Sequence, residues 1–162
     1  MVTESIFELT SQDETERFAA CLATHIKPLS FNDPFIMTFQ GDLGTGKTTF
    51  IRAMLKRLGI TTAIKSPTYA LVESYDCLAF EVHHFDLYRL TDEIELEYIG
   101  FKDYFTKHSI CCIEWPERAP HCLSNKDVAF NLFVKGEGRL LQVRAFKRAG
   151  IDMLVKLAKE FA

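Results

Sequence analysis

The amino-acid sequence predicts an α/β fold in which a mainly parallel central sheet carries antiparallel strands toward the C-terminus. Segments with strand character alternate with segments of helical periodicity through the first two thirds of the chain, an order that is typical of parallel strands. A glycine-rich stretch, GDLGTGKTTF at 41–50, joins one such strand to one such helix. Two alternating segments within 128–146 predict a hairpin near the C-terminus.

Length and composition bound the possibilities. The 162 residues suit a single domain, 1–162, with one hydrophobic core. Apolar residues make up 48% and charged residues 25%, which is ordinary for a globular protein. The net charge of −3 excludes recognition of nucleic acid through a strongly basic overall charge.

The first elements follow from local patterns. SIFEL, residues 5–9, favours a strand. Ser11 and Glu14 form a capping-box pattern that predicts the start of a helix, and Pro28 ends that helix. The apolar positions of the helix are Phe18, Cys21, Leu22 and Ile26.

The glycine-rich stretch lies between a predicted buried strand and a predicted amphipathic helix. The apolar run that begins at Phe35 predicts a strand ending at Gln40. From Phe50 onward, apolar residues recur at helical spacing until Gly59 ends the helix.

Downstream segments continue the alternation. After Pro67, a strand begins with Tyr69, Leu71 and Val72, and the next, within 79–86, ends at Asp86. The remaining elements are a helix over 91–105 interrupted at Gly100, a strand over 109–114 stopped by Pro116, a hairpin turning at 136–138, and a last helix over 150–162.

Cysteine usage and the N-terminus indicate a cellular location. The five cysteines include no Cys-x-x-Cys pair, which argues against a zinc site and against a disulfide framework. We interpret them as small buried hydrophobic residues, with Cys111 and Cys112 on opposite sides of a strand. Because the N-terminus is acidic and no apolar run approaches the length of a membrane helix, we expect a cytoplasmic protein with no membrane partner.

The glycine-rich stretch fits the phosphate-binding pattern G-x-x-x-x-G-K-[ST]. Its context between strand and helix predicts a P-loop NTPase-like three-layer sandwich. Backbone N–H groups and the helix N-terminus would cradle phosphates, Lys47 would reach the β- and γ-phosphates, and the Thr48 hydroxyl would bind Mg²⁺. The candidate loop residues are Gly41, Asp42, Leu43, Gly44, Thr45, Gly46, Lys47, Thr48 and Thr49.

Two acids end predicted strands, where ligands bind in sheets of this kind. Glu114 follows four apolar residues, as a Walker B acid does, so holding Mg²⁺ and acting as a base both remain open for it. Asp86 is the second candidate for either task, and each acid alone also fits an exposed strand end. Ser66 and Thr68 suit either a nucleotide switch or a plain turn.

These stretches together resemble the TsaE family, also called YjeE, the P-loop ATPase of bacterial tRNA threonylcarbamoyladenosine biosynthesis. The resemblance covers about residues 41 to 118, with weaker likeness on both sides. The stretches that carry it are GDLGTGKTTF, KSPTYALVESY, HHFDLYRL, DEIELEYIGFKDYF and ICCIEWPER.

The resemblance implies binding of ATP and Mg²⁺ and joint action with TsaD and TsaB, which assemble the modification on adenosine 37 of tRNA. In the family, hydrolysis supports repeated rounds of that synthesis, and tRNA is expected to be reached through the complex. The roles implied by matching motif are phosphate contact for Lys47, metal binding for Thr48 and Glu114, activity for Asp86, a switch-like segment for Ser66 and Thr68, and proximity to the base for Arg139 with the chain at 10–12.

Other functions remain open from the residues alone. A small-molecule kinase of the P-loop class needs an arginine-bearing lid, and the arginines here are scattered. A GTPase is disfavoured because NKDV at 125–128 puts Val128 where guanine recognition needs a carboxylate. A nucleotide-dependent scaffold or regulatory switch without its own substrate is the third alternative.

Overall fold

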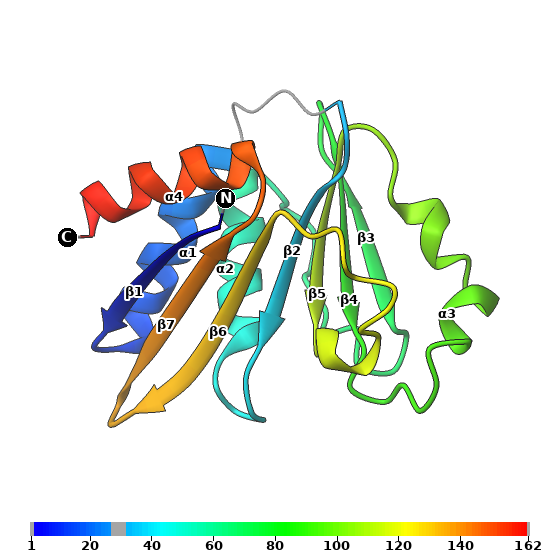
Figure 1. Cartoon of the computed structure of the whole chain (residues 1–162), viewed down its shortest axis with the longest axis horizontal. Coiled ribbons are helices and arrows are strands. Elements are labelled where there is room, and N and C mark those ends of the chain that lie inside the picture. The colour runs from blue at the N-terminus through cyan, green and yellow to red at the C-terminus, as the bar shows by residue number, and fades with distance from the viewer. Residues whose placement is uncertain (1, 27–31, 162) are drawn as a thin grey trace.

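The computed structural model describes residues 2–26 and 32–161, and it confirms the α/β class (Figure 1). Seven strands form one sheet in the order β1-β7-β6-β2-β5-β4-β3. The elements are β1 (Thr3–Leu9), α1 (Gln12–Ile26), β2 (Phe35–Gln40), α2 (Lys47–Leu58), β3 (Val72–Asp76), β4 (Glu81–Asp86), α3 (Glu95–Tyr98), the 3₁₀ turn η1 (Phe101–Tyr104), β5 (Ser109–Glu114), the 3₁₀ turn η2 (Pro116–Arg118), β6 (Val128–Lys135), β7 (Gly138–Ala145) and α4 (Arg148–Glu160).

The middle of the sheet is parallel. Strand β2 pairs in parallel with β5 and β6, and β4 pairs in parallel with β5. Antiparallel pairing of β6, β7 and β1 extends one side, as the predicted hairpin requires. On the other side β3 pairs antiparallel with β4, a second hairpin that the sequence patterns did not indicate.

Two cores cover the two faces of the sheet. Helices α1, α2 and α4 pack on one face, where Phe39 stacks on Phe130 with ring centroids 4.8 Å apart and Phe50 packs 5.5 Å from both rings. The segments around α3 and η1 cover the smaller core on the other face. Cys112 belongs to the first core and Cys111 to the second, so the two cysteines do lie on opposite sides of β5.

Several local predictions are confirmed. The backbone N–H of Glu14 donates to the Ser11 hydroxyl at 3.2 Å, which caps α1. Gly59 ends α2 with a φ of 108°, and Gly100, with a φ of 69°, separates α3 from η1. Pro28, expected to end the first helix, lies outside the described residues.

The prediction that Tyr69 and Leu71 begin a strand is wrong. Strand β3 starts at Val72, Tyr69 is 83% exposed, and Leu71 has a φ of 69°. The Leu71 backbone N–H donates to the Pro67 carbonyl at 2.7 Å, so a turn occupies this segment although its residue types favour strands.

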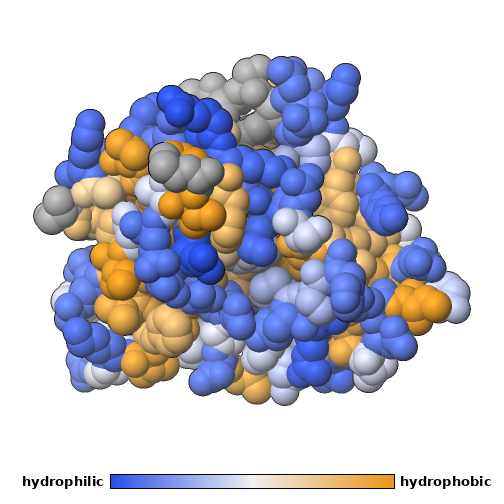
Figure 2. Space-filling model, in the orientation of Figure 1, coloured by the Kyte–Doolittle hydropathy of each residue, from blue (hydrophilic) through white to orange (hydrophobic). Residues whose placement is uncertain are grey.

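The burial of the cysteines and the hydropathy of the surface can be compared with the sequence predictions. All five cysteines lie in the described ranges, and none forms a disulfide. Cys111 and Cys112 are buried as predicted, whereas Cys21 and Cys77 are only partly buried and Cys122 is exposed. On the face seen in Figure 2, hydrophilic residues separate small hydrophobic areas. No helix within residues 2–26 and 32–161 has the length and apolar character needed to cross a membrane.

Candidate functional site

The glycine-rich loop connects β2 to α2 and turns on residues with positive φ. Gly44 and Gly46 have φ angles of 81° and 96°, backbone conformations that residues with a Cβ atom rarely adopt. A Cβ on Gly41 would lie 2.7 Å from the Thr45 hydroxyl and 2.8 Å from the Leu132 carbonyl oxygen. Because Gly46 is the N-cap of α2, the loop leads directly into the N-terminal donors of that helix.

A cleft of about 510 Å³ opens beside this loop, a size within the usual range of ligand sites. Its lining comes from the loop, the start of α1, the ends of β4 and β5 and the hairpin between β6 and β7. The lining residues are Gln12, Thr15, Leu43, Gly44, Thr45, Gly46, Lys47, Thr48, Thr49, Thr68, Asp86, Tyr88, Glu114, Trp115, Glu137 and Arg139.

Lys47 supplies a positive charge at the cleft, and contacts with the loop and with Trp115 fix its position. Its Nζ donates to the carbonyl oxygens of Gly41 and Asp42, the second at 3.1 Å, and lies 4.2 Å from the centroid of the Trp115 ring. Burial lowers the pKa of Lys47, and the nearby Glu114 carboxylate opposes that effect. Trp115 has a φ of 59°, unusual for a bulky residue and typical of functional sites.

The two candidate acids lie side by side because β4 and β5 are parallel and in register. Asp86 is paired with Glu114 across the strands, and both are buried, at 5% and 2% exposure. The Thr48 hydroxyl donates to the Glu114 carboxylate, with oxygen distances of 3.1 and 3.2 Å. Glu114 therefore faces the first turn of α2, and Asp86 lies beside it.

Asp86 is held by the segment that follows α2. Its Oδ2 accepts from the Thr68 hydroxyl at 2.9 Å, and its Oδ1 accepts from the Tyr88 backbone N–H at 3.1 Å. Ser66 and Thr68 share a hydrogen bond of 2.8 Å. Thr68 lines the cleft, whereas Ser66 is exposed outside it.

Arg139 at the start of β7 lies against the loop. Its Nε donates to the Thr45 carbonyl at 2.6 Å, and its Nη2 donates to the Gly44 carbonyl at 3.2 Å. The guanidinium thereby braces the loop main chain. Of the neighbouring chain segment 10–12, Gln12 lines the cleft and Thr10 does not.

The sequence interpretation missed His84. Its Nε2 lies 2.6 Å from Glu114 Oε2, with both side chains almost completely buried, and its Nδ1 has no partner among the described residues. The carboxylate oxygen can only accept, so Nε2 is the donor of this hydrogen bond. The signal was present: Val82, His84 and Asp86 alternate along β4, which predicts one shared face.

The site therefore brings together most of the predicted residues. Residues 43–49, Thr68, Asp86, Glu114 and Arg139 meet at one cleft, while Gly41 and Asp42 lie beside it as acceptors for Lys47 and Ser66 stays apart. Hydroxyl and carboxylate oxygens beside a cationic side chain and a helix N-terminus are suited to a metal-bound polyphosphate.

Comparison with known proteins agrees with this geometry. Residues 9–141 match the family model described as threonylcarbamoyl adenosine biosynthesis protein TsaE. The chain belongs to the TsaE family. The tRNA threonylcarbamoyladenosine biosynthesis protein TsaE of Haemophilus influenzae is 38% identical over 138 residues, which cover 85% of this chain and 87% of that protein.

Other relatives extend the same result. The protein of the same name from Rickettsia prowazekii is 37% identical, covering 82% of this chain and 89% of that one. The crystal structure of Bacillus subtilis YdiB superposes with a TM-score of 0.79 at 22% identity, covering 99% of this chain and 97% of that chain, and it supports the fold.

Proposed function

We propose that this TsaE family member binds ATP with Mg²⁺ in the cleft and hydrolyses it in support of threonylcarbamoyladenosine formation at position 37 of tRNA, acting with TsaD and TsaB. One observation carries the enzymatic part. Glu114 accepts from the hydroxyl of Thr48, at the start of the helix that carries Lys47, and Asp86 is paired with Glu114 across β4 and β5. A loop that bound nucleotide for stability alone would not need two buried acids here.

The donor set fits Mg²⁺. Thr48 and Glu114 offer hard oxygen ligands 3.1 Å apart, and the second carboxylate, Asp86, is their register neighbour. Bound there, Mg²⁺ would neutralise charge on the phosphates. A thiol would favour softer metals, and this group of ligands contains none.

The remaining residues would divide the work. Lys47 would exchange its loop carbonyls for phosphate oxygens, and the N–H groups at the start of α2 would bind the same anion. One acid would orient the attacking water while the other supports the metal, with His84 fixing the direction of the Glu114 carboxylate. Thr68 is hydrogen-bonded to both Asp86 and Ser66, so a change in the contacts of Asp86 on nucleotide binding would move the segment around Ser66.

We further propose that the isolated chain hydrolyses ATP slowly. Arg139 is the one arginine among the described residues lining the cleft, and its guanidinium is engaged with loop carbonyls. Arg89 lies 4.1 Å from the centroid of the Tyr69 ring. A cation for the transition state would then come from TsaD or TsaB, as arginine fingers supplied in trans do. We also propose that the protein acts in the cytoplasm, where it would meet its tRNA-modifying partners.

Calorimetric titration of ATP in the presence of Mg²⁺ tests the site. Lys47→Ala should weaken binding at least about tenfold, the equivalent of roughly 1.4 kcal/mol, since a charge-assisted contact is lost. Lys56→Ala, an exposed change on the same helix, is the matched control and should bind as the parent does. Equal ATP affinity in all three proteins would overturn the assignment.

A further inference from the structure

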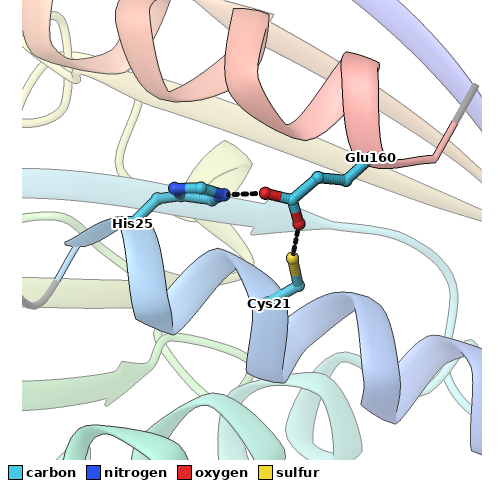
Figure 3. A group of neighbouring side chains, drawn as sticks. All are labelled: Cys21, His25 and Glu160. Carbon is cyan, nitrogen blue, oxygen red and sulfur yellow. Dashed lines mark hydrogen bonds and ion pairs between the residues drawn. The ribbon is translucent and has the colours of Figure 1, made fainter.

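A second group of ligating side chains lies between α1 and α4. Cys21 and His25 are one helical turn apart on α1, and Glu160 at the end of α4 points between them (Figure 3). The Cys21 thiol donates to Glu160 Oε2, and His25 Nε2 lies 2.7 Å from Glu160 Oε1. One ligand atom from each residue lies within 4.8 Å of the others.

This cluster is separate from the nucleotide cleft. Gln12, at the start of α1, lines the cleft, while Cys21 and His25 follow nine and thirteen residues later on the same helix. At a rise of 1.5 Å per residue they lie about 14 and 20 Å further along the helix axis. None of the three side chains has a role in ATP binding or hydrolysis as proposed above.

We propose that Cys21, His25 and Glu160 form a binding site for a divalent transition metal, with Zn²⁺ as the best match. A thiolate, an imidazole nitrogen and a carboxylate oxygen are all zinc ligands, and water would complete a tetrahedral set. The thiolate disfavours Mg²⁺ and Ca²⁺, which prefer oxygen alone. Thiolate and carboxylate together balance the two positive charges of the ion.

Packing between the end of α4 and α1 brings the three ligands together even when no metal is bound. Phe161, directly after Glu160, packs against Phe18 with centroids 4.9 Å apart, and the Arg17 guanidinium lies 4.4 Å from the Phe161 ring. Both partners of Phe161 are on α1, so the last turn of α4 is held against the helix that carries Cys21 and His25. The side chains of His25 and Glu160 are 18% and 45% exposed, which leaves an entry path for an ion.

Proton balance distinguishes this site from a redox switch. Burial and the neighbouring Glu160 raise the pKa of the Cys21 thiol to about 11, so the thiol is protonated and a poor nucleophile at neutral pH. No other cysteine belongs to the cluster, so there is no second thiol for a disulfide. Metal binding would form the sulfur–metal bond and release the thiol proton to water. His25 would bind through Nε2, so the ring proton that faces Glu160 would exchange through water to Nδ1.

The site would fasten the C-terminal helix to α1. Cys21 and Glu160 are 139 positions apart in the chain, so one ion would join segments from nearly opposite ends of the sequence. A ligand that binds only the folded protein raises its stability in proportion to the logarithm of ligand concentration over the dissociation constant.

The test uses the full-length protein, stripped with a chelator and titrated with Co²⁺ and then Zn²⁺. Cobalt reports directly on the ligands, because a thiolate–Co²⁺ bond gives a charge-transfer band in the near ultraviolet that ions bound at Thr48 and Glu114 cannot produce. We expect one Co²⁺ per chain with this band, displacement by Zn²⁺, and a higher melting temperature with Zn²⁺.

Variants assign the ligands. Cys21→Ser should abolish the band, and His25→Ala and Glu160→Gln should weaken Zn²⁺ binding at least about tenfold, because even groups behind metal ligands contribute that much. Cys122→Ser, at an exposed cysteine outside the cluster, should keep both the band and the affinity. Absence of the band from folded parent protein, or its persistence in Cys21→Ser, would overturn the proposal, as would unchanged Zn²⁺ affinity in both His25→Ala and Glu160→Gln.

Discussion

At the scale of single residues, Glu114 is the point where contacts converge. It accepts from Thr48, pairs with His84 and lies across from Asp86, and the side chains of Glu114, His84 and Asp86 are buried. A buried carboxylate is stable only when such partners surround it. Glu114 also lines the cleft together with Lys47, so the partners that permit its burial hold it at the proposed site.

The two acids should act on turnover more than on binding. Glu114→Ala and Asp86→Ala are each expected to lower kcat by about 10² to 10⁴, the range for loss of an acid–base or water-orienting group, with ATP affinity changed only a few-fold. Steady-state phosphate release and ATP titration measure the two quantities. Glu117→Ala, at an exposed acid on η2, serves as the control. Parent-like kcat in both acid variants would remove these residues from the mechanism.

His84 should behave as a positioning residue. His84→Ala removes the group 2.6 Å from Glu114 Oε2, and we expect kcat to fall about 10- to 100-fold while KM for ATP stays near the parent value. His84→Gln keeps an N–H donor and should restore part of the rate. A change in KM alone, or equal rates for the alanine and glutamine variants in folded protein, would contradict this role.

At the scale of elements, α2 links the core to the site. It begins at Lys47 in the cleft, and its Phe50 packs against both Phe39 and Phe130 on the sheet. The aromatic contacts therefore fix the height and rotation of the helix whose first turn presents Lys47 and Thr48.

Removing that anchor should destabilise the fold. Phe50→Ala is expected to lower the free energy of unfolding by about 3–5 kcal/mol, as Phe→Ala changes in packed cores do. Phe133→Ala, at a position 50% exposed, should change it by less than about 0.5 kcal/mol. Urea unfolding followed by circular dichroism compares the three proteins, and similar losses in both variants would contradict the assigned packing.

Local patterns predicted most elements, because periodicity and caps are properties of neighbouring residues. The loop, the broken helix at Gly100 and the hairpin before α4 were all visible in this way. The turn before Val72 was not, since Tyr69 and Leu71 favour strands and only the tertiary fold holds Leu71 at positive φ. The antiparallel place of β3 depends likewise on pairing with β4.

The parts of the site that belong to sequence motifs or to strand ends could be predicted. Asp86 and Glu114 stood out because acids follow apolar runs, and register then brought them together. His84 was not predicted, because its contact with Glu114 depends on the pairing of β4 with β5 and not on spacing along the chain. The Cys21–His25–Glu160 cluster was missed for the same reason, since its third member comes from the far end of the chain.

At the scale of the whole molecule, one sheet collects the proposed machinery. The parallel strands β2, β4 and β5 end at the same edge, where the loop, both acids and Trp115 line one cleft. The described residues form a single sheet with its packed helices. The NKDV segment lies at the start of β6, where Asp127 accepts from the Ile36 backbone N–H at 2.8 Å; that is the end of β2 away from the loop, so this segment cannot read a base in the cleft.

Steady-state phosphate release from Mg²⁺-ATP tests the central claim most directly, measured with the purified chain alone and then with TsaD and TsaB added. The account predicts slow release by the isolated chain and a clear increase with both partners, abolished by Lys47→Ala, because the cleft holds the phosphates and acids while its own arginine is engaged with the loop. Fast release by the chain alone that ignores both partners, or no release under any of these conditions, would contradict it.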